Sequence, residues 1–271
     1  MLDSIFKDTM ASMNWKEIEI AATNDTLVLV PVSVIEEHGP HLSLAVDCLC
    51  SYILCRLIRE ELKKFQRSSL ISPPYYWGIN NATGGFPGSF TVRKETLRYM
   101  IIDLLLSLHR WGFKRLFIIN WHGDKEHLLT IVDAIQEAGV NFGVRAFIVL
   151  SEFEVERLKI SQSIPYIVCI KEDQARQNYL DIHAGSDEVS IISNFFPEHV
   201  NEELASRLEP TNLTKEDLNI WNKGWFDTKT LIPEGYFGNP KDFSKEKGRV
   251  IIEQKSKLIA TQIESFLRMN G

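Results

Sequence analysis

The sequence predicts an α/β fold: a single domain over residues 1–271, layered α/β/α, with a mainly parallel sheet. Short apolar, β-branched runs alternate along the chain with helical patterns, and this alternation is typical of a parallel sheet with helices on its faces. The apolar share of 44% and the charged share of 24% are ordinary for a globular protein. Many undivided α/β domains have this length.

The first part of the chain supplies the clearest elements. A β-branched run at 27–34 predicts a buried strand, and apolar residues at helical spacing predict a helix over 47–65 with a charged outer face. A strand near 70–71 leads into a loop at 75–78. Thr91 is expected to cap the next helix.

The alternation continues in the middle of the chain. We expect a helix over 93–111, a strand over 115–119, a helix that ends near residue 138, and a strand over 146–150. Each apolar run is short enough for a strand, and each helical pattern is long enough to cover one.

Two segments complete the chain. Apolar residues at helical spacing predict a final helix over 244–269. Residues 151–180 show no clear period, and we interpret them as an insertion over the functional site.

Composition and charge argue against two classes of partner. The net charge of −6, without a basic cluster, disfavours nucleic acid, and no apolar run approaches the roughly 20 residues of a membrane span. The N-terminus lacks the regions of a signal peptide. We interpret the four cysteines as free thiols of a cytoplasmic protein, because their spacing fits neither a zinc site nor a thioredoxin motif; they are Cys48, Cys50, Cys55 and Cys169.

The first of three polar clusters directly follows the strand at 27–34. It contains Glu36, His38 and Asp47. In open α/β sheets, sites lie at the carboxyl ends of the strands, and residues two apart on an extended backbone point the same way. Mixed nitrogen and oxygen ligands suit zinc or manganese, with iron as a further candidate.

Two further clusters repeat the pattern. His122 and Asp124 follow the strand at 115–119, and His183 precedes a helix whose first turn would hold Glu188. One cluster alone is equally compatible with a polar surface loop. Three clusters at element ends along one chain favour a dinuclear metal site.

The motifs resemble those of the creatininase family of metal-dependent amidohydrolases. They are Glu-x-His-Gly-x-His-Leu-x-Leu-x-x-Asp from Glu36, Asn-x-His-Gly from Asn120, and His-Ala-Gly-x-x-Glu-x-Ser from His183. The loop at 84–89 is similar to the family's Phe-Pro-Gly-Thr loop. The resemblance extends over roughly residues 27–265 and implies a creatininase-like fold.

The resemblance also implies two divalent metal ions, with Asp47 bridging them. The matching ligands are Glu36, Asp47 and His122 for one ion, and His38, Asp47 and Glu188 for the other. His183 matches the family's catalytic histidine. Asp124 falls where creatininase has a glutamate, and it ligates a metal, acts through water or serves as a base.

Several other positions have two interpretations. The loop residues Gly88 and Ser89 either line the substrate pocket or form a structural turn. Trp121 is either a pocket wall or part of the core, and His41 either orients a ligand or lies on the surface. We interpret His127 as structural.

This set of residues predicts hydrolysis by an activated water. A pair of metals about 3.5–4 Å apart lowers the pKa of bound water from about 15.7 toward about 7. His183 then donates a proton to the leaving nitrogen. We therefore expect a metal-dependent amidohydrolase that cleaves a C–N bond of a small amide, a creatinine-like lactam or a formamide.

The sequence is less informative about the substrate. Creatininase closes tryptophans over its substrate from the segment before the third motif, whereas residues 151–182 contain none and offer Phe153, Tyr166 and Tyr179. This argues against creatinine itself. Two alternatives stay open: a metallopeptidase acting on a small peptide precursor, and a catalytically inactive metal-binding member. The latter would follow from Lys125 and Val189, which replace the usual Asn and Thr.

The resemblance implies a small-molecule substrate and a homo-oligomer, a hexamer by analogy with the family. Both expectations rest on the resemblance. The oligomer in particular cannot be read from composition or spacing, because the surface patch that forms an interface is not visible in a sequence.

Overall fold

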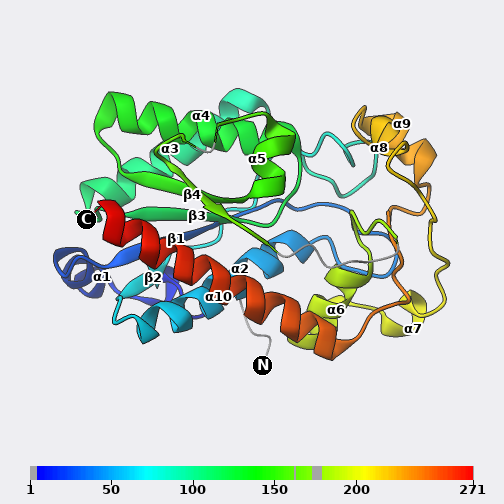
Figure 1. Ribbon diagram of the computed structural model, residues 1–271, viewed down its shortest axis with the longest axis horizontal. Coiled ribbons are helices and arrows are strands. Elements are labelled where there is room, and N and C mark those ends of the chain that lie inside the picture. The colour runs from blue at the N-terminus through cyan, green and yellow to red at the C-terminus, as the bar shows by residue number, and fades with distance from the viewer. Residues whose placement is uncertain (1–4, 162, 173–178, 271) are drawn as a thin grey trace.

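The computed structural model describes residues 5–161, 163–172 and 179–270. Its centre is a five-stranded sheet in the order β2-β1-β3-β4-β5, with parallel pairing throughout. The strands β1 to β5 span Leu27–Val32, Ser69–Ile71, Leu116–Asn120, Ala146–Ser151 and Ile167–Ile170. Helices cover both faces of the sheet (Figure 1), which confirms the predicted α/β class.

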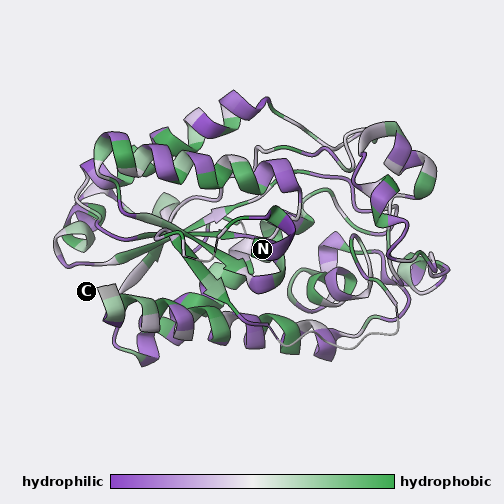
Figure 2. Cartoon of the chain, turned by 45° about the horizontal axis from the view of Figure 1, so that its top comes forward, coloured by the Kyte–Doolittle hydropathy of each residue, from purple (hydrophilic) through white to green (hydrophobic). Residues whose placement is uncertain are grey.

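Strand β1 is buried along its whole length because its two faces enter different parts of the core. Val28 and Val30 pack with apolar residues of α3 and α4, whereas Leu27 and Leu29 pack with those of α2 and α10. These four helices span Val46–Lys64 (α2), Lys94–Arg110 (α3), Lys125–Phe142 (α4) and Lys245–Asn270 (α10). Figure 2 shows the strands as mainly hydrophobic, and the surrounding helices as alternately hydrophobic and hydrophilic.

Shorter helices complete the fold. They are α1 (Trp15–Thr23), α5 (Glu152–Leu158), α6 (Ser186–Phe195), α7 (Glu202–Ala205), α8 (Leu218–Trp221) and α9 (Trp225–Leu231), with 3-10 turns at Met10–Ser12 and Pro197–His199. Helices α6 to α9 lie beyond the carboxyl ends of the strands, on the right in Figure 1. The C-terminal end of α10 lies at the opposite end of the molecule.

Most predicted elements are present, with corrections at their ends. Helix α4 runs to Phe142 rather than to about residue 138, because it ends only where Gly143 adopts a left-handed φ of 71°. Thr91 does not cap α3: the residue before that helix is Arg93, which makes no capping hydrogen bond. The Thr91 hydroxyl instead accepts a hydrogen bond from the backbone N–H of Asn80 at 3.1 Å.

The interpretation of residues 151–180 as an insertion is wrong for residues 151–170. Ser151 and Glu154 form a capping box that starts α5. The segment then returns as β5, which pairs with β4 at the edge of the sheet. This part of the chain therefore belongs to the α/β alternation itself, while residues 173–178 lie outside the described residues.

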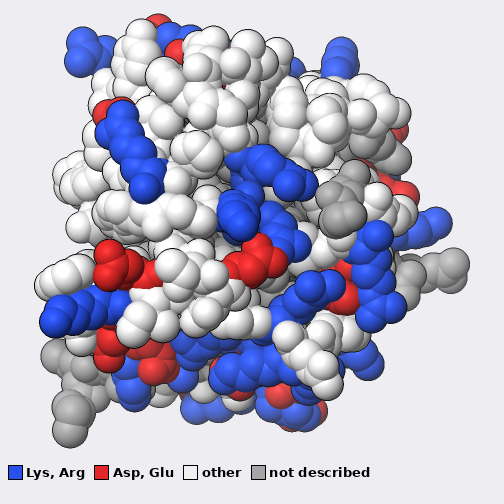
Figure 3. All heavy atoms as spheres, turned by 90° about the vertical axis from the view of Figure 1, so that its left-hand side faces the viewer, with Lys and Arg blue, Asp and Glu red and all other residues white. Residues whose placement is uncertain are grey.

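The surface carries charges of both signs. On the face shown in Figure 3, basic side chains gather with acidic ones among them. Exposed ion pairs such as Lys63–Glu60 and Lys64–Glu61, at 2.7 and 2.6 Å, contribute little to stability. Across the described part of the chain, no helix combines the length and the apolar character that crossing a membrane requires.

Candidate metal centre

The site lies where the strand order reverses, between β1 and β3. The chain leaves β1 toward β2 on one side, and β3 pairs with β1 on the other side. Such a switch point opens a crevice at the carboxyl ends of a parallel sheet. Glu36 and His38 follow β1, and His122 follows β3, so three of the predicted ligands enter this crevice from strand ends.

Two helix starts supply the remaining carboxylates. Asp47 lies in the first turn of α2, and Glu188 lies in the first turn of α6. The first turn of a helix presents backbone N–H groups and the positive end of the helix dipole, which stabilises a negative side chain. The fold thus brings together five residues that are separated by up to 152 positions in the sequence.

The five side chains form two groups that share Asp47. In the first group, His122 Nδ1 lies 3.0 Å from Glu36 Oε2 and 3.0 Å from Asp47 Oδ2. In the second, His38 Nε2 lies 3.6 Å from Asp47 Oδ1 and 3.7 Å from Glu188 Oε2. Each group has the donor atoms within 4.8 Å of one another, as a shared metal ion requires.

Both histidines turn their second ring nitrogen toward these carboxylates. His122 donates its Nε2–H to the carbonyl of Ile79 at 3.0 Å, and His38 donates its Nδ1–H to the carbonyl of Glu36 at 3.1 Å. In the neutral form of each imidazole, the other ring nitrogen would offer its lone pair to a metal ion. A metal-binding histidine is fixed in the same way, by a carbonyl or carboxylate that accepts its remaining N–H.

The charge balance of the site calls for cations. Burial is the largest single influence on the pKa of His38 and would lower it, but the carboxylates of Glu188 and Asp47 outweigh burial and raise this pKa to about 10. Burial likewise opposes charge on Asp47, yet its contacts with His122 and His38 hold the pKa of Asp47 well below its usual range. Three carboxylates are thus gathered where solvent is nearly excluded.

Two buried atoms of the site also lack hydrogen-bond partners. These are His38 Nε2 and Asp47 Oδ2, both buried in the described structure. Unpaired buried polar groups are costly, so two of them at one point are expected where a protein binds a metal ion. The nitrogen and oxygen donors, the buried negative charge and the unpaired atoms all fit two divalent metal ions.

Groups outside the two sets fix the orientation of the ligands. The Thr83 hydroxyl donates to Glu36 Oε1. The Trp121 indole Nε1–H donates to Glu188 Oε1 at 3.0 Å, and the backbone N–H of Ala184 donates to Glu188 Oε2 at 2.7 Å. Sequence reasoning did not find Thr83, because a threonine in a glycine-rich loop carries no recognisable signal.

His183 lies beside the second group. Its ring centroid is 4.3 Å from that of His38, and its Nε2–H donates to the carbonyl of Glu37 at 2.8 Å. His183 can also be grouped with Glu36 and His38 as a ligand set, but this third set shares two of its members with the others. It therefore adds no independent site.

The metal groups open into a cavity of about 820 Å³. Its wall includes Trp121, Asp124 and His183 among the predicted residues, and it also includes Trp221, which comes from α8. The structure does not place Gly88 or Ser89 on this wall. Ser89 instead accepts a hydrogen bond from the backbone N–H of Glu37 at 3.1 Å and donates one to Thr83 at 3.1 Å.

The carboxylate of Asp124 is engaged by the backbone. Its Oδ1 accepts from the N–H of His127 at 3.0 Å, and its Oδ2 accepts from the N–H of Asn81 at 2.9 Å. Asp124 is the N-cap of α4 and belongs to none of the ligand groups found among the described residues. This arrangement gives it a structural function at the cavity wall.

Two other histidines support the surrounding loops. His41 is buried, and its Nε2–H donates to the carbonyl of Ala184 at 3.0 Å, so it braces the loop that holds Glu188. His127 is also buried, and its Nδ1 accepts from the backbone N–H of Ile79 at 3.3 Å. This agrees with a structural interpretation of His127.

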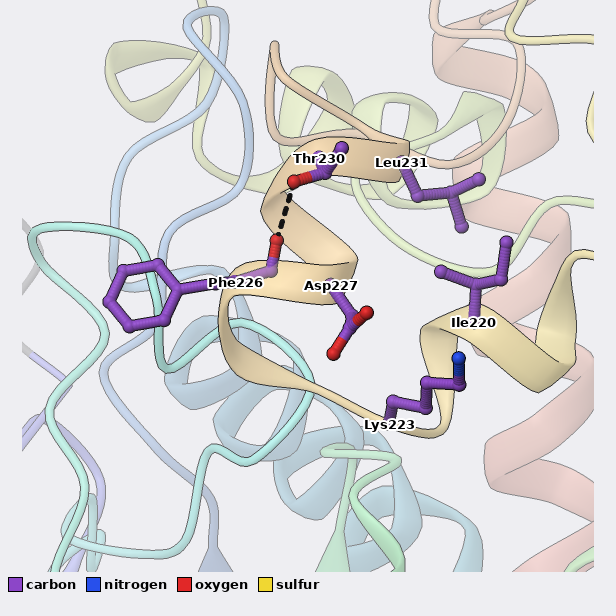
Figure 4. Close-up of a pocket in the computed structure, with 6 residues that line it drawn as sticks. All are labelled: Ile220, Lys223, Phe226, Asp227, Thr230 and Leu231. Carbon is purple, nitrogen blue, oxygen red and sulfur yellow. Dashed lines mark hydrogen bonds between the residues drawn. The ribbon is translucent and has the colours of Figure 1, made fainter.

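A second cavity, of about 560 Å³, lies between α8 and α9 (Figure 4). It is lined by Ile220, Lys223, Phe226, Asp227, Thr230 and Leu231, and it shares no lining residue with the cavity over the metal groups. Figure 4 shows the Phe226 ring directed away from the other labelled side chains. Lacking a histidine or a cluster of carboxylates, this cavity offers no comparable chemistry.

Comparison with known proteins agrees with the geometry. The family model Creatininase, described as creatinine amidohydrolase, matches residues 11–263. A creatinine amidohydrolase of Pseudomonas putida is 27% identical over 269 residues, covering 93% of this chain and 94% of the relative. A mycofactocin precursor peptide peptidase of Mycolicibacterium smegmatis is 24% identical and covers 64% of this chain and 60% of the relative. A 3-dehydro-scyllo-inosose hydrolase of Thermotoga maritima is 23% identical, with 94% and 83% covered.

Solved structures share the fold. A creatininase described as the manganese form superposes with a TM-score of 0.70 at 22% identity, over 96% of this chain and 98% of that one. A mutant creatininase described as zinc–zinc type superposes with a TM-score of 0.71 at 22% identity, over 97% and 99% of the two chains. The likeness extends over nearly the whole of each chain.

Proposed function

Because this chain belongs to the creatininase family, we propose that it is a metal-dependent amidohydrolase that uses two divalent ions to cleave a C–N bond of a small amide, lactam or formamide. The observation that carries the proposal is the pair of buried ligand groups sharing Asp47. A shared carboxylate holds two cations close together, which is the arrangement that two-metal hydrolases use.

Zinc and manganese are the ions we propose, with iron as a further candidate. Two imidazole nitrogens and three carboxylates suit these metals better than calcium or magnesium, which prefer oxygen alone. Two creatininase structures with the same fold are described as manganese and zinc–zinc forms. In this chain Glu36, Asp47 and His122 would hold one ion, and His38, Asp47 and Glu188 the other.

When bound, a pair of such ions supplies Lewis acidity toward a carbonyl oxygen and water that is more acidic than in bulk. The residues of this chain hold the proposed metal ligands in position. Trp121 and Ala184 hold Glu188 in place, so that the ligand does not swing into the cavity. Burial of the ligands keeps bulk water from competing for them.

His183 is the proposed proton donor. Its Nε2 is occupied by the Glu37 carbonyl, so Nδ1 is the nitrogen available to a substrate in the cavity that His183 lines. Burial lowers the pKa of His183 and the neighbouring His38 lowers it further, but the carboxylates of Glu36 and Glu37 outweigh both and raise it. A raised pKa strengthens Nδ1 as a proton acceptor, so the Nε2–H tautomer can take up a proton at Nδ1 and pass it to the leaving nitrogen.

The cavity is large for a small lactam. About 820 Å³ lies within the range of about 300–1,000 Å³ of pockets that take drug-sized ligands. This size, together with the relatives described as peptide peptidases, favours a metallopeptidase acting on a short peptide precursor as the second candidate function. Both functions use the same metals and differ only in what occupies the outer cavity.

The departures from the family pattern do not remove the proposed machinery. Val189 is buried in the core beside α2, and Lys125 is exposed at the start of α4. Neither belongs to a ligand group of the described structure. All five proposed ligands and His183 are present, so we propose an active enzyme rather than a retired one.

The test is a panel of amide substrates after metal loading. Purified protein is incubated with zinc or manganese and assayed with small lactams, formamides and short peptides of matched charge. Turnover of a formamide or lactam that is lost in Asp47→Ala supports the amidohydrolase, and turnover of peptides alone supports the peptidase. An absence of turnover across the panel, despite two bound metals, would overturn both. Assembly as a homo-oligomer and a cytoplasmic location stay predictions.

A further inference from the structure

Glu37 stands between two proposed metal ligands in the sequence, but its side chain belongs to neither group. It is only 6% exposed, and no Lys or Arg pairs with it in the described structure. Its Oε1 is buried and has no hydrogen-bond partner of ideal geometry. Burying a carboxylate without a partner is expensive, so this residue calls for an explanation.

The Glu37 carboxylate faces the edge of His183. Its Oε1 lies 3.3 Å from His183 Nε2, the same nitrogen that donates to the Glu37 backbone carbonyl at 2.8 Å. The Oε1 atom and the backbone carbonyl of Glu37 therefore both face the same N–H of the imidazole. The backbone of His183 is fixed independently, because it exchanges hydrogen bonds with Phe237 at 3.2 and 2.8 Å.

The surroundings hold the carboxylate in this position. Its Oε2 accepts from the backbone N–H of Gly39 at 3.0 Å. Gly235, at a φ of 74°, packs directly against the carboxylate, because a Cβ there would sit 2.2 Å from Oε2. The backbone N–H of Glu37 is in turn held by Ser89 at 3.1 Å. This gives the loop residue Ser89 an indirect role near the site.

A carboxylate, unlike an amide, can serve both neighbouring donors. Oε1 faces the His183 N–H and Oε2 faces the Gly39 N–H, so both positions need an acceptor. A glutamine has one acceptor oxygen and one NH₂ group. Either orientation of its amide would place two donors face to face.

We propose that Glu37 is a positioning residue that fixes His183 as the Nε2–H tautomer and leaves Nδ1 toward the substrate. The inference rests on the role proposed above for His183 and deepens it. The Glu37 side chain lines neither the substrate cavity nor the two ligand groups sharing Asp47 in the described structure, so we expect its effect on the reaction to pass through His183. Carboxylate–imidazole pairs elsewhere orient a catalytic histidine in the same manner.

The test is a double-mutant cycle of Glu37→Gln and His183→Ala on the best amide of the panel. The expected result is that Glu37→Gln lowers kcat by about 10-fold, a part of the roughly 100- to 10,000-fold that a general acid contributes, and leaves KM within about 2-fold. In the His183→Ala background, Glu37→Gln should have no further effect. Glu264→Gln is the matched control, because Glu264 is also a buried carboxylate but lies on α10, paired with Arg67.

A second readout does not depend on turnover. Nitrogen-15 spectra of the imidazole groups in the metal-loaded protein should show His183 as the Nε2–H tautomer in the wild type and a mixture in Glu37→Gln. Glu37→Asp, which retracts the carboxylate, should give the same mixture and serves where Glu37→Gln fails to fold.

The outcomes separate this inference from the proposed function. Equal effects of Glu37→Gln with and without His183, or an unchanged tautomer, would overturn the positioning role. Wild-type kcat in His183→Ala would instead overturn the role of His183 as the proton donor. An impaired His183→Ala together with a fully active Glu37→Gln would contradict the inference alone.

Discussion

The two metal sites should be separable by substitutions that touch only one ligand each. Trp121→Phe removes the indole N–H that holds Glu188 Oε1 at 3.0 Å but keeps an aromatic ring in place. Thr83→Val removes the hydroxyl that holds Glu36 Oε1 and keeps the volume. Glu188 belongs to the second ligand group and Glu36 to the first, so the two changes should act on different ions.

The size of the effect follows from the bonds that are lost. A hydrogen bond to a charged group contributes about 1.5–3 kcal/mol, and loss of such an outer partner lowers metal affinity by about 10- to 100-fold. Glu188 retains its second donor, the Ala184 N–H at 2.7 Å, so its carboxylate stays near His38. We therefore expect Trp121→Phe to weaken one zinc ion by about 10-fold and leave the other unchanged.

The assay is a competition titration of each variant against a chromophoric zinc chelator, which resolves two dissociation constants. Thr83→Val should weaken the other ion. In the double variant each ion should weaken by the change seen in its own single variant, so that the total loss of binding free energy is the sum of the two. Equal weakening of both ions by a single substitution, or no weakening by either, would refute the assignment of these ligands to two groups.

Four further predictions follow from the same contacts. Removal of the metals by a chelator should lower the melting temperature, because three carboxylates, two of them buried, lose their cations. Zinc at 100 times its Kd should restore about 2.7 kcal/mol; an unchanged melting temperature would contradict this. His183→Ala should lower kcat by about 100-fold or more while metal content stays the same, as elemental analysis would check. Asp124→Ala should cost about 0.5–2 kcal/mol in urea denaturation by removing the cap of α4 and should leave kcat within about 2-fold, whereas a large loss of kcat would show that Asp124 acts as a base. The hydrogen bond from Arg67 is the largest influence that lowers the pKa of Glu264. The stability that this ion pair provides is therefore present above the unfolded pKa of about 4.3 and is lost as the pH falls through the lower folded pKa. Glu264→Gln should destabilise the protein by about 1 kcal/mol at pH 7, and urea denaturation should show this difference shrinking as the pH is lowered; a difference that does not change with pH would contradict the ion pair.

The ligand motifs were readable from the sequence because short-range rules place them. Glu36 and His38 directly follow a β-branched strand, and the first turn of a helix follows at Asp47, so the local pattern already indicates a crevice at a strand end. The structure then brings these residues together with His122 and Glu188. Hydrophobic periodicity predicted the strands and the long helices for the same reason, since it depends on near neighbours.

What the sequence did not reveal depends on distant contacts. In the sequence, Glu37 cannot be distinguished from an exposed loop carboxylate. Its proposed role depends on its contact with His183, which lies 146 residues away. Trp221 reaches the cavity wall from α8, far from the segment in which an aromatic cover was sought. Strand β5 was missed because four apolar residues at a sheet edge give too short a run to distinguish from a loop.

The role of the loop at 84–89 could not be predicted from the sequence for a different reason. A glycine-rich turn between two elements is compatible with a pocket wall or with a tight structural turn, and only three-dimensional contacts decide between them. Here Ser89 bonds to Glu37 and Thr83, so the loop supports residues near the metal groups rather than lining the cavity.

The measurement that tests the central claim most directly is metal content per chain in three proteins: the wild type, Glu188→Ala and Asp47→Ala. Because Asp47 belongs to both ligand groups and Glu188 to one, the wild type should hold about two equivalents of zinc or manganese, Glu188→Ala about one, and Asp47→Ala essentially none. Two equivalents retained in Asp47→Ala, or none bound by the wild type after loading with either metal, would contradict a dinuclear centre built on this shared carboxylate.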